Sequence, residues 1–397
     1  MFYYWIVILL VLFVQLSYSN EINYDIDGSV GNGWEFVRDL FKENFIKERD
    51  LGAQLAIYHQ GELVVDLWGG WFDRSYTKRY DNNTLQIVFS SSKGVVAIAA
   101  ALCVQRGLLS YSDLVTKYWP EYGKYGKDNT TVADILSHRA GLPTDPSPIE
   151  IMFNWTAVIH QLENSAPLWP PGSSSSYHAL TYGWLAGELI RRVDPKKRSV
   201  GQFIQDELAR PLNLEFYIGL PSEQEYRVSP LTFSKESLQT FNETVQATFA
   251  LFNSPQVHAT EIPAANGITN ARSLARLYAS LMTDLDNGQQ KRLLNPDILK
   301  QALKLPMQGE ELNILSNISA PFTMGFMLYS SLFTILGPDT FGHSGAGGSI
   351  GLAFPSKNLS FAFVMNQLDP YIITFPRIQT ILEKTVEKLT PKNVHFK

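Results

Sequence analysis

β-Strand patterns lie near both ends of this 397-residue chain, and helical patterns fill the long stretch between them. Two short segments rich in β-forming residues, Gly52–His59 and Glu62–Trp68, are separated by Gln60–Gly61, which favours a hairpin. The strand candidates near the C-terminus are Phe322–Tyr329, Ser349–Phe354 and Leu359–Met365. Because strands come from both ends, we expect the ends to pair into one antiparallel sheet while the middle forms a separate helical lobe.

Apolar residues at helical spacing predict a helix over Trp34–Arg49 and a closing helix over Phe375–Leu389. Residues 93–283 are mostly helical in pattern, with intervening loops rich in Pro, Gly and Ser. The expected fold class is therefore α/β (α+β), a sheet flanked by helices with an inserted, mainly helical lobe. The expected bounds are about 25–85 and 320–390 for the sheet lobe and about 90–320 for the helical lobe, within a single domain of residues 20–397. A cleft between two lobes is the natural place for a site.

The N-terminus predicts a signal peptide over residues 1–19. Met1–Leu16 is almost wholly apolar and leads into the small, polar stretch Ser17–Ser19, which resembles an h-region followed by a cleavage site. The region before it lacks a basic side chain, so an uncleaved membrane anchor is the alternative, although the apolar run is shorter than the roughly 20 residues of a spanning helix. We expect a secreted protein, or one in the lumen of the secretory pathway, without a stable membrane span after cleavage.

Other features of the sequence agree with that route. Six sites match Asn-x-Ser/Thr and are predicted glycosylation sites: Asn82, Asn129, Asn154, Asn242, Asn317 and Asn358. Cys103 is the only cysteine, so no intrachain disulfide forms, and its apolar surroundings predict a buried side chain. The formal net charge is −5 and no basic cluster interleaved with aromatics occurs, so nucleic acid is not an expected partner.

The motif Ser-x-x-Lys provides a serine with a base. A serine hydroxyl is a poor nucleophile at neutral pH unless an adjacent group takes its proton, and a lysine can do so if its pKa is lowered. On a helix, residues three apart lie on one face, so the amine reaches the hydroxyl. A helix N-terminus and apolar burial both disfavour the ammonium form.

This motif occurs twice, and its context separates the two copies. Ser75–Lys78 lies in a charged, turn-rich stretch and is most simply a solvated loop. Ser90–Lys93 follows an apolar segment and opens the long run Val95–Leu109, whose small and aliphatic residues suit a buried helix. Ser90 is therefore the candidate nucleophile and Lys93 its proton acceptor, and the backbone N–H of Ser90 at the helix N-terminus is free to face an oxyanion.

Two further segments are candidates for the site. Tyr177 follows a turn-forming Trp-Pro-Pro-Gly and precedes a helical run, so it is either a proton carrier facing a cleft or a half-buried packing aromatic. The glycine-dense stretch Phe341–Gly348 precedes a predicted strand, and its glycines permit close backbone approach to a ligand. His343 in that stretch either donates a hydrogen bond, titrates near neutrality, or is simply a polar residue at a strand end. The nearby Gly-His-Ser-Gly-Ala around Ser344 nearly matches a nucleophile elbow, but a strand follows where that motif requires a helix.

Together these segments resemble the serine β-lactamase and penicillin-binding-protein superfamily, most closely its class C-like carboxylesterase and β-lactamase-related branch. The resemblance covers roughly residues 25–390 and rests on the motif at Ser90, LSHRAGLP, PPGSSSSYHALTYGWLAGELIRR, NGITNARSLARLYASL and GHSGAGGSIGLAFP. It implies that Ser90 attacks a carbonyl, that Lys93 and Tyr177 shuttle protons, and that the N–H groups of Ser90 and Ala346 form the oxyanion hole. It also implies a structural role for His138, which orders a loop by hydrogen bonds.

Two departures from the family pattern bear on the substrate. Tyr177-His178-Ala179 replaces the usual Tyr-x-Asn, and the substrate-binding segment His343-Ser344-Gly345 replaces Lys-Thr-Gly, so an amide side chain and a fixed positive charge are missing. We therefore expect a serine hydrolase acting on a small-molecule ester or amide ahead of a β-lactam. The alternatives are a peptidase or transacylase with the same acyl-enzyme, and a non-catalytic scaffold or binding protein. No cofactor is expected, and no metal, because the seven histidines form no cluster of ligand spacing.

Overall fold

The computed structural model describes residues 25–306, 310–311, 321–330, 334–370 and 375–390. A seven-stranded antiparallel sheet has the order β1-β3-β2-β13-β12-β11-β10. Its strands are β1 (Ile26–Val30), β2 (Gly52–His59), β3 (Glu62–Gly70), β10 (Met327–Leu328), β11 (Phe341–Ser344), β12 (Ile350–Phe354) and β13 (Leu359–Met365). The two ends of the chain meet where β13 pairs with β2, from Leu359 opposite His59 to Met365 opposite Ala53. The predicted sheet made from both chain ends is confirmed.

The C-terminal strands differ from the prediction at two places. Phe341–Ser344, described from the sequence only as a glycine-dense stretch before a strand, is itself the strand β11. Of the segment Phe322–Tyr329, only Met327–Leu328 is a strand. The chain turns just before it, since Gly325 has φ +95° and its N–H donates to the carbonyl of Thr323. A side chain on Gly325 would also collide with the Tyr182 hydroxyl, 2.3 Å away. The extended run is therefore broken by a turn that packs against the helical part of the chain.

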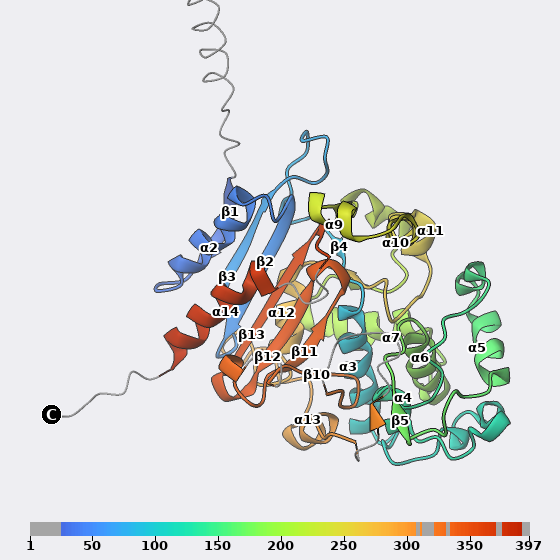
Figure 1. The fold of residues 1–397 in the computed structure, drawn as a ribbon. Coiled ribbons are helices and arrows are strands. Elements are labelled where there is room, and N and C mark those ends of the chain that lie inside the picture. Colours follow the sequence, from blue (N-terminus) through green and yellow to red (C-terminus); the bar gives the residue numbers. More distant parts are fainter. Residues whose placement is uncertain (1–24, 307–309, 312–320, 331–333, 371–374, 391–397) are drawn as a thin grey trace, which may run out of the picture.

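Helices cover both faces of the sheet (Figure 1). Helices α2 (Glu35–Ile46) and α14 (Phe375–Leu389) lie on one face, where the rings of Phe41 and Phe363 are in contact. Helix α12 (Ala271–Ala279) lies on the other, since Ser360 donates to the carbonyl of Ala275. Because Phe363 and Ser360 are three apart on β13, they point to opposite faces. Helix α12 thus packs on the sheet although it lies within the range expected for the helical lobe.

Helix α3 (Ser91–Gln105) runs between the sheet and the helical lobe. Every residue from Ser91 to Cys103 is buried, and the helix contacts both β11 and α6 (Thr181–Val193). Its small and aliphatic residues leave no polar face, which is the composition of a helix packed on all sides. The prediction of a buried helix after Ser90, and of a buried Cys103, is confirmed.

The remaining elements are short. The other helices are α4 (Val132–Leu136), α5 (Trp155–Asn164), α7 (Val200–Ile204), α8 (Arg210–Leu212), α9 (Lys235–Thr240), α10 (Glu243–Leu251), α11 (Pro255–Ala259) and α13 (Pro296–Ala302). The other strands are β4 (Gln86–Ile87), β5 (Ser174–Ser175), β6 (Phe216–Tyr217), β7 (Thr232–Phe233), β8 (Ile268–Thr269), β9 (Glu310–Glu311) and β14 (Gln367–Leu368). The small sheet β4-β8-β6 holds the segment that leads into α3.

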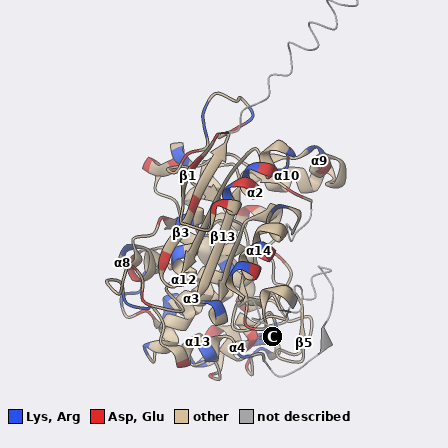
Figure 2. Cartoon of the chain, turned by 90° about the vertical axis from the view of Figure 1, so that its left-hand side faces the viewer, with Lys and Arg blue, Asp and Glu red and all other residues tan. Residues whose placement is uncertain are grey.

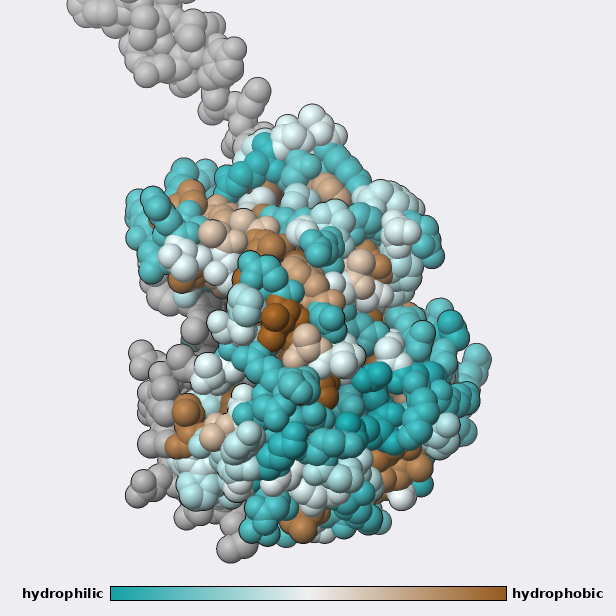
Figure 3. Space-filling model, turned by 90° about the vertical axis from the view of Figure 1, so that its right-hand side faces the viewer, coloured by the Kyte–Doolittle hydropathy of each residue, from teal (hydrophilic) through white to brown (hydrophobic). Residues whose placement is uncertain are grey.

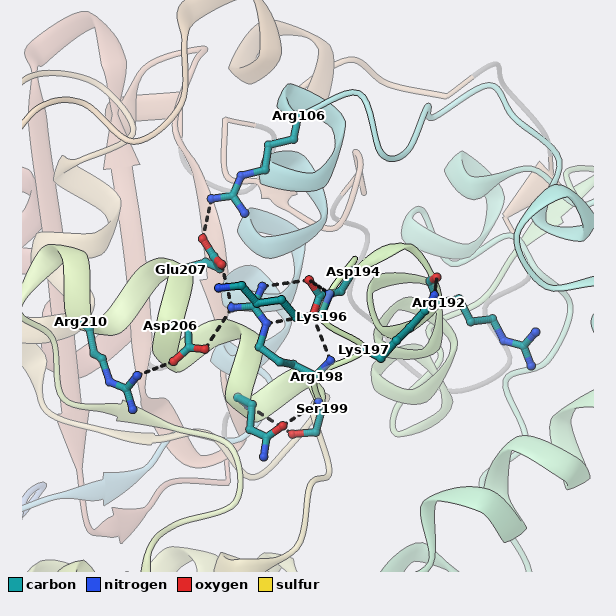
Figure 4. A network of polar contacts seen from close by, with 11 residues as sticks. Arg106, Arg192, Asp194, Lys196, Lys197, Arg198, Ser199, Asp206, Glu207 and Arg210 are labelled. Carbon is teal, nitrogen blue, oxygen red and sulfur yellow. Dashed lines mark hydrogen bonds and ion pairs between the residues drawn. The ribbon is translucent and has the colours of Figure 1, made fainter.

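An ion-pair network ties the helical lobe to α3 (Figure 4). The Arg198 guanidinium donates two hydrogen bonds to the Asp194 carboxylate, at 2.8 and 2.9 Å, and pairs with Asp206 and Glu207. Glu207 in turn pairs with Arg106 at the end of α3. The Asp194 side chain is only 1% exposed, so the centre of this network lies inside the packed lobe and not on the surface.

The surface mixes charges and hydrophobic groups. Figure 2 shows Lys and Arg interspersed with Asp and Glu on the face that carries α14. Figure 3 shows hydrophobic side chains gathered in the hollow between the two halves of the opposite face. No helix among the described residues is both long enough and apolar enough to cross a membrane.

The predicted signal peptide, residues 1–19, lies outside the described residues, and so does Asn317. The side chains of the predicted glycosylation sites Asn82, Asn129, Asn154 and Asn242 are exposed. Asn358 is half-buried in the turn between β12 and β13.

Candidate active site

Ser90 and Lys93 meet at the start of α3. Ser90 precedes the helix and is partly exposed, whereas Lys93, one turn along, has no exposed surface. The Lys93 Nζ lies 3.0 Å from Ser90 Oγ, 2.7 Å from the carbonyl of Ala179 and 2.9 Å from the carbonyl of Ala264. The two carbonyls can only accept, so they use two N–H groups of the amine. In a neutral amine the remaining lone pair then faces the Ser90 hydroxyl.

Burial favours this neutral form. Desolvation lowers the pKa of Lys93 from its ordinary 10.5 to about 7, and the carboxylate of Asp145 opposes the shift only in part. A lysine in this position exchanges protons readily at neutral pH.

Tyr177 comes from a distant segment between β5 and α6. Its phenol is close enough to Ser90 for the serine to lower the phenol pKa, and its ring centroid lies 4.8 Å from Lys93 Nζ. The side chain is partly exposed, and burial of the phenol raises its pKa above the ordinary value. The phenol is therefore neutral at physiological pH, and the structure brings together the three side chains that the sequence singled out.

The segment around His138 positions Tyr177. The Nδ1 of His138 accepts from the backbone N–H of His178 at 3.0 Å, and the carbonyl of His138 accepts from Ser176. The Nε2 of His178 accepts from the N–H of Leu142, also at 3.0 Å. Both residues that flank Tyr177 are thus fixed by the same loop, which agrees with the structural role predicted for His138.

The end of β11 is fastened beside Ser90. The Ser91 hydroxyl lies 3.2 Å from the carbonyl of His343 and 3.1 Å from that of Ser349. Gly345 packs so closely that an added Cβ would lie 2.0 Å from the carbonyl oxygen of Val88. These contacts place the next residue, Ala346, immediately beside the segment that leads into Ser90.

The backbone at this junction leaves donors free. Phe89 has φ +43°, a conformation that bulky residues adopt rarely and that is found at strained functional turns. The backbone N–H groups of Ser90 and Ala346 donate to no other described residue. Ser90 and Ala346 are both partly exposed, so the geometry suits an oxyanion hole built from these two amides.

His343 donates a hydrogen bond, as one of the expected alternatives had it, but only to the backbone of the next residue. It is buried in β11, its Nδ1 donates to the carbonyl of Ser344, and its Nε2 has no partner among the described residues. Burial lowers its pKa to about 3, so the expectation that it titrates near neutrality is wrong. Ser344 is buried as well, with its hydroxyl 3.9 Å from the sulfur of Met327. A substrate-binding role for His343-Ser344-Gly345 stays a prediction.

The competing motifs have no catalytic geometry. The Ser75 hydroxyl bonds with Thr77 in an exposed loop, and Lys78 Nζ donates to the carbonyl of Tyr226 instead of reaching Ser75. Ser344 lies at the end of a strand that leads into another strand, as the sequence indicated.

The sequence reasoning missed three groups that contact the lysine or its neighbours. The carbonyls of Ala179 and Ala264 are backbone atoms, which no residue type announces. Asp145 follows the Gly-Leu-Pro turn, and its Oδ1 accepts from the N–H of Leu180 at 3.0 Å. The one sequence signal that pointed to Asp145 was an acidic residue two positions after that turn.

Comparisons with known proteins agree with this geometry. The family model described as Beta-lactamase matches residues 37–376. The protein named Esterase/beta-lactamase LipL from Mycobacterium tuberculosis is 30% identical over 359 residues, 84% of this chain and 81% of its own length.

Solved structures give the same result. A family VIII carboxylesterase matches with a TM-score of 0.83 and 30% identity, over 92% of this chain and all of its own. A penicillin-binding-protein homologue from Caulobacter crescentus matches with a TM-score of 0.79 and 35% identity, over the same share of both chains. The chain therefore belongs to the beta-lactamase family and is a carboxylesterase-like serine hydrolase.

Proposed function

We propose that the protein hydrolyses a small ester or amide through an acyl intermediate on Ser90. The observation that carries the proposal is the position of the Lys93 amine, 3.0 Å from Ser90 Oγ, with both N–H groups of the neutral amine held by two carbonyls. That arrangement leaves one lone pair for the serine proton.

The first half of the reaction forms the acyl-enzyme. Ser90 Oγ attacks the substrate carbonyl carbon while its proton passes to Lys93 Nζ, and the oxyanion accepts from the N–H groups of Ser90 and Ala346. Collapse of the tetrahedral intermediate breaks the bond to the alcohol or amine, which takes a proton from Tyr177. The proton on Lys93 restores the phenol. Preorganised oxyanion donors are each worth about 3 kcal/mol of barrier in other serine enzymes.

The second half releases the acid. A water attacks the acyl carbonyl, gives one proton to the Lys93 and Tyr177 pair, and forms a second tetrahedral intermediate in the same oxyanion hole. Its collapse frees the carboxylic acid and returns the proton to Ser90 Oγ. The closeness of the Tyr177 ring to Lys93 Nζ, 4.8 Å from its centroid, and of its phenol to Ser90 supports this shared role of the phenol.

The choice of substrate rests on charge. Ala179 stands where the family pattern has Asn, and His343 stands where it has Lys. His178, next to Ala179, and His343 are both buried. Burial lowers the pKa of His178 to about 4 and that of His343 to about 3, so neither carries positive charge at neutral pH. A substrate carboxylate would find no fixed cation on these residues, which favours a neutral ester or small amide. Similarity to a carboxylesterase structure supports the same class.

Covalent labelling tests the proposal. A fluorophosphonate probe should add to the wild-type protein and not to Ser90→Ala, as read by intact mass. Ser75→Ala is the matched control, because it removes the serine of the second Ser-x-x-Lys and should leave labelling and hydrolysis of p-nitrophenyl butyrate unchanged. An adduct that persists in Ser90→Ala would contradict the assignment of the nucleophile.

We also propose that the mature protein is secreted or lumenal, beginning near residue 20. The apolar Met1–Leu16 segment and the exposed predicted sites Asn82, Asn129, Asn154 and Asn242 support this. Expression in a eukaryotic secretory host should give a product that lacks residues 1–19 by N-terminal sequencing and loses mass on N-glycosidase treatment. A product that retains Met1 and stays in the membrane fraction would favour the anchor instead.

A further inference from the structure

A single peptide unit connects the Lys93 amine to a carboxylate on another loop. The carbonyl of Ala179 accepts from Lys93 Nζ at 2.7 Å. The N–H of the same peptide unit, that of Leu180, donates to Asp145 Oδ1 at 3.0 Å. The carboxylate, the peptide and the amine therefore form one continuous hydrogen-bonded chain that ends at Ser90.

The loop that carries Asp145 is held against this peptide by two further bonds. The N–H of Leu142 donates to His178 Nε2 at 3.0 Å, and the Thr181 hydroxyl donates to the carbonyl of Leu142 at 2.7 Å. The residues on both sides of the 179–180 peptide are thus clamped to the loop. Asp145 keeps a fixed position relative to the peptide.

The other carbonyl on Lys93 lacks such a partner. It belongs to the peptide unit of Ala264 and Ala265, whose N–H donates to the neutral carbonyl of Ile262 at 2.8 Å. Hydrogen bonds in a chain polarise one another, and an ionised acceptor strengthens the chain most. The 179–180 peptide is consequently the stronger of the two acceptors for the amine.

We propose that Asp145 is a positioning residue, which fixes and polarises the 179–180 peptide so that the Lys93 amine is aimed at Ser90. The inference rests on the proposed function, because it assigns Asp145 a role in proton transfer from Ser90. Asp145 is half-buried and bonds to the backbone; it needs no contact with the reacting atoms.

The other titratable groups near Lys93 are uncharged at neutral pH. Burial lowers the pKa of His138, His178 and His343, and it raises the pKa of Tyr177. The pKa of Asp145 is raised above its ordinary value, because burial outweighs the lowering by the Leu180 N–H and by Lys93. Among the described residues that influence Lys93, Asp145 alone supplies negative charge, and it favours the ammonium form of the lysine.

Two substitutions separate the charge from the hydrogen bond. Asp145→Asn retains an oxygen for the Leu180 N–H and removes the charge, so the inflection in the pH profile of kcat/KM should move down by about one pH unit. Its rate at pH 9, where Lys93 is neutral in both proteins, should stay within about twofold of the wild type. Asp145→Ala removes the bond as well, and its kcat at pH 9 should fall about tenfold with little change in KM.

Asp284→Asn is the matched control, because Asp284 also accepts from a backbone N–H, that of Arg292, but makes no contact with the site. It should leave the pH profile unmoved. An inflection in Asp145→Asn that coincides with the wild type, or that moves equally in Asp284→Asn, overturns the inference, and so does Asp145→Ala with wild-type kcat. Thermal unfolding of each variant identifies any that fail to fold, and Asp145→Asn remains informative if Asp145→Ala does not fold.

The two proposals fail differently. A wild-type protein that takes no fluorophosphonate label overturns the proposed function and this inference with it. A labelled, active wild type whose pH profile is indifferent to Asp145→Asn overturns the inference alone.

Discussion

The Lys93 amine makes activity depend on pH in a defined direction. Its pKa falls from 10.5 to about 7 because the side chain is buried. At pH 7 about half of the amines are neutral, whereas a lysine with the ordinary pKa would be neutral in about 0.03% of molecules. Burial therefore raises the reactive fraction about 10³-fold. Since only the neutral amine accepts the Ser90 proton, kcat/KM should rise about tenfold from pH 6 to pH 8 and then level.

The lowered pKa of Lys93 also makes the free energy of unfolding depend on pH. The unfolded chain binds a proton at lysine up to pH 10.5, and the folded protein releases it above about pH 7. Between these values the unfolded state holds more protons, so stability rises with pH. Below pH 7 the buried ammonium costs about 5 kcal/mol relative to an exposed lysine, and above pH 10.5 this cost disappears.

Lys93→Met isolates both effects. The substitution removes the titrating group and leaves the carbonyls of Ala179 and Ala264 without their partner, at a cost of about 3 kcal/mol. The variant should therefore be about 2 kcal/mol more stable than the wild type at pH 6 and about 2 kcal/mol less stable at pH 10, where a small part of the lysine's cost remains. It should also lose the rise in residual kcat/KM between pH 6 and 8.

The assay combines initial rates on p-nitrophenyl butyrate from pH 5.5 to 9, corrected for spontaneous hydrolysis, with urea unfolding of both proteins at pH 6 and 10. A wild-type profile that is flat across pH 6 to 8 would refute the reasoning. So would a difference in unfolding free energy between Lys93→Met and wild type that is the same at both pH values, because the buried amine would then not titrate as stated.

Three further predictions concern other parts of the chain. Gly345→Ala places a Cβ against the Val88 carbonyl, so the turn that carries the oxyanion donor must move, and kcat should fall about 100-fold in the p-nitrophenyl butyrate assay while the protein remains folded by circular dichroism. Arg198 holds the pKa of Asp194 at about 2, so Asp194→Asn should lower the free energy of unfolding by about 2 kcal/mol at pH 7, and urea titrations should show this difference closing as the pH falls from about 4 towards 2. Lys78→Met removes the lysine of the second Ser-x-x-Lys and should change neither the rate of ester hydrolysis nor the fluorophosphonate labelling. A loss of more than about twofold in kcat/KM would mean that Ser75–Lys78 takes part in catalysis.

The bounds of a helix or strand were predicted well where the local residue pattern alone determines the structure. The β2 and β13 strands and helix α14 have the bounds that the runs of β-forming residues and the helical spacing indicated. The prediction of one strand over Phe322–Tyr329 was wrong, because a turn at Gly325, which packs against Tyr182, interrupts an otherwise β-rich run.

The site was predictable only in part, for a similar reason. Ser90 and Lys93 were found because one helix sets their spacing. The distance of Tyr177 from them, the burial that neutralises His343 and the link through Asp145 all depend on contacts between segments far apart in sequence. The carbonyl acceptors of Lys93 are backbone atoms, which every residue type has, so the sequence could not identify them.

The three serines at the start of α3 show how helix geometry divides roles among identical residues. Ser90 is partly exposed and faces Lys93 and Tyr177. The Ser91 hydroxyl bonds to the carbonyl of His343 in β11, and the Ser92 hydroxyl accepts from the N–H of Gly267 beside β8. Successive residues on a helix point about 100° apart, so one turn faces the Lys93 amine, the large sheet and the small sheet in sequence. The two residues that follow the proposed nucleophile are therefore each bonded to a different sheet, which fixes the start of α3 and with it the direction of the Ser90 hydroxyl.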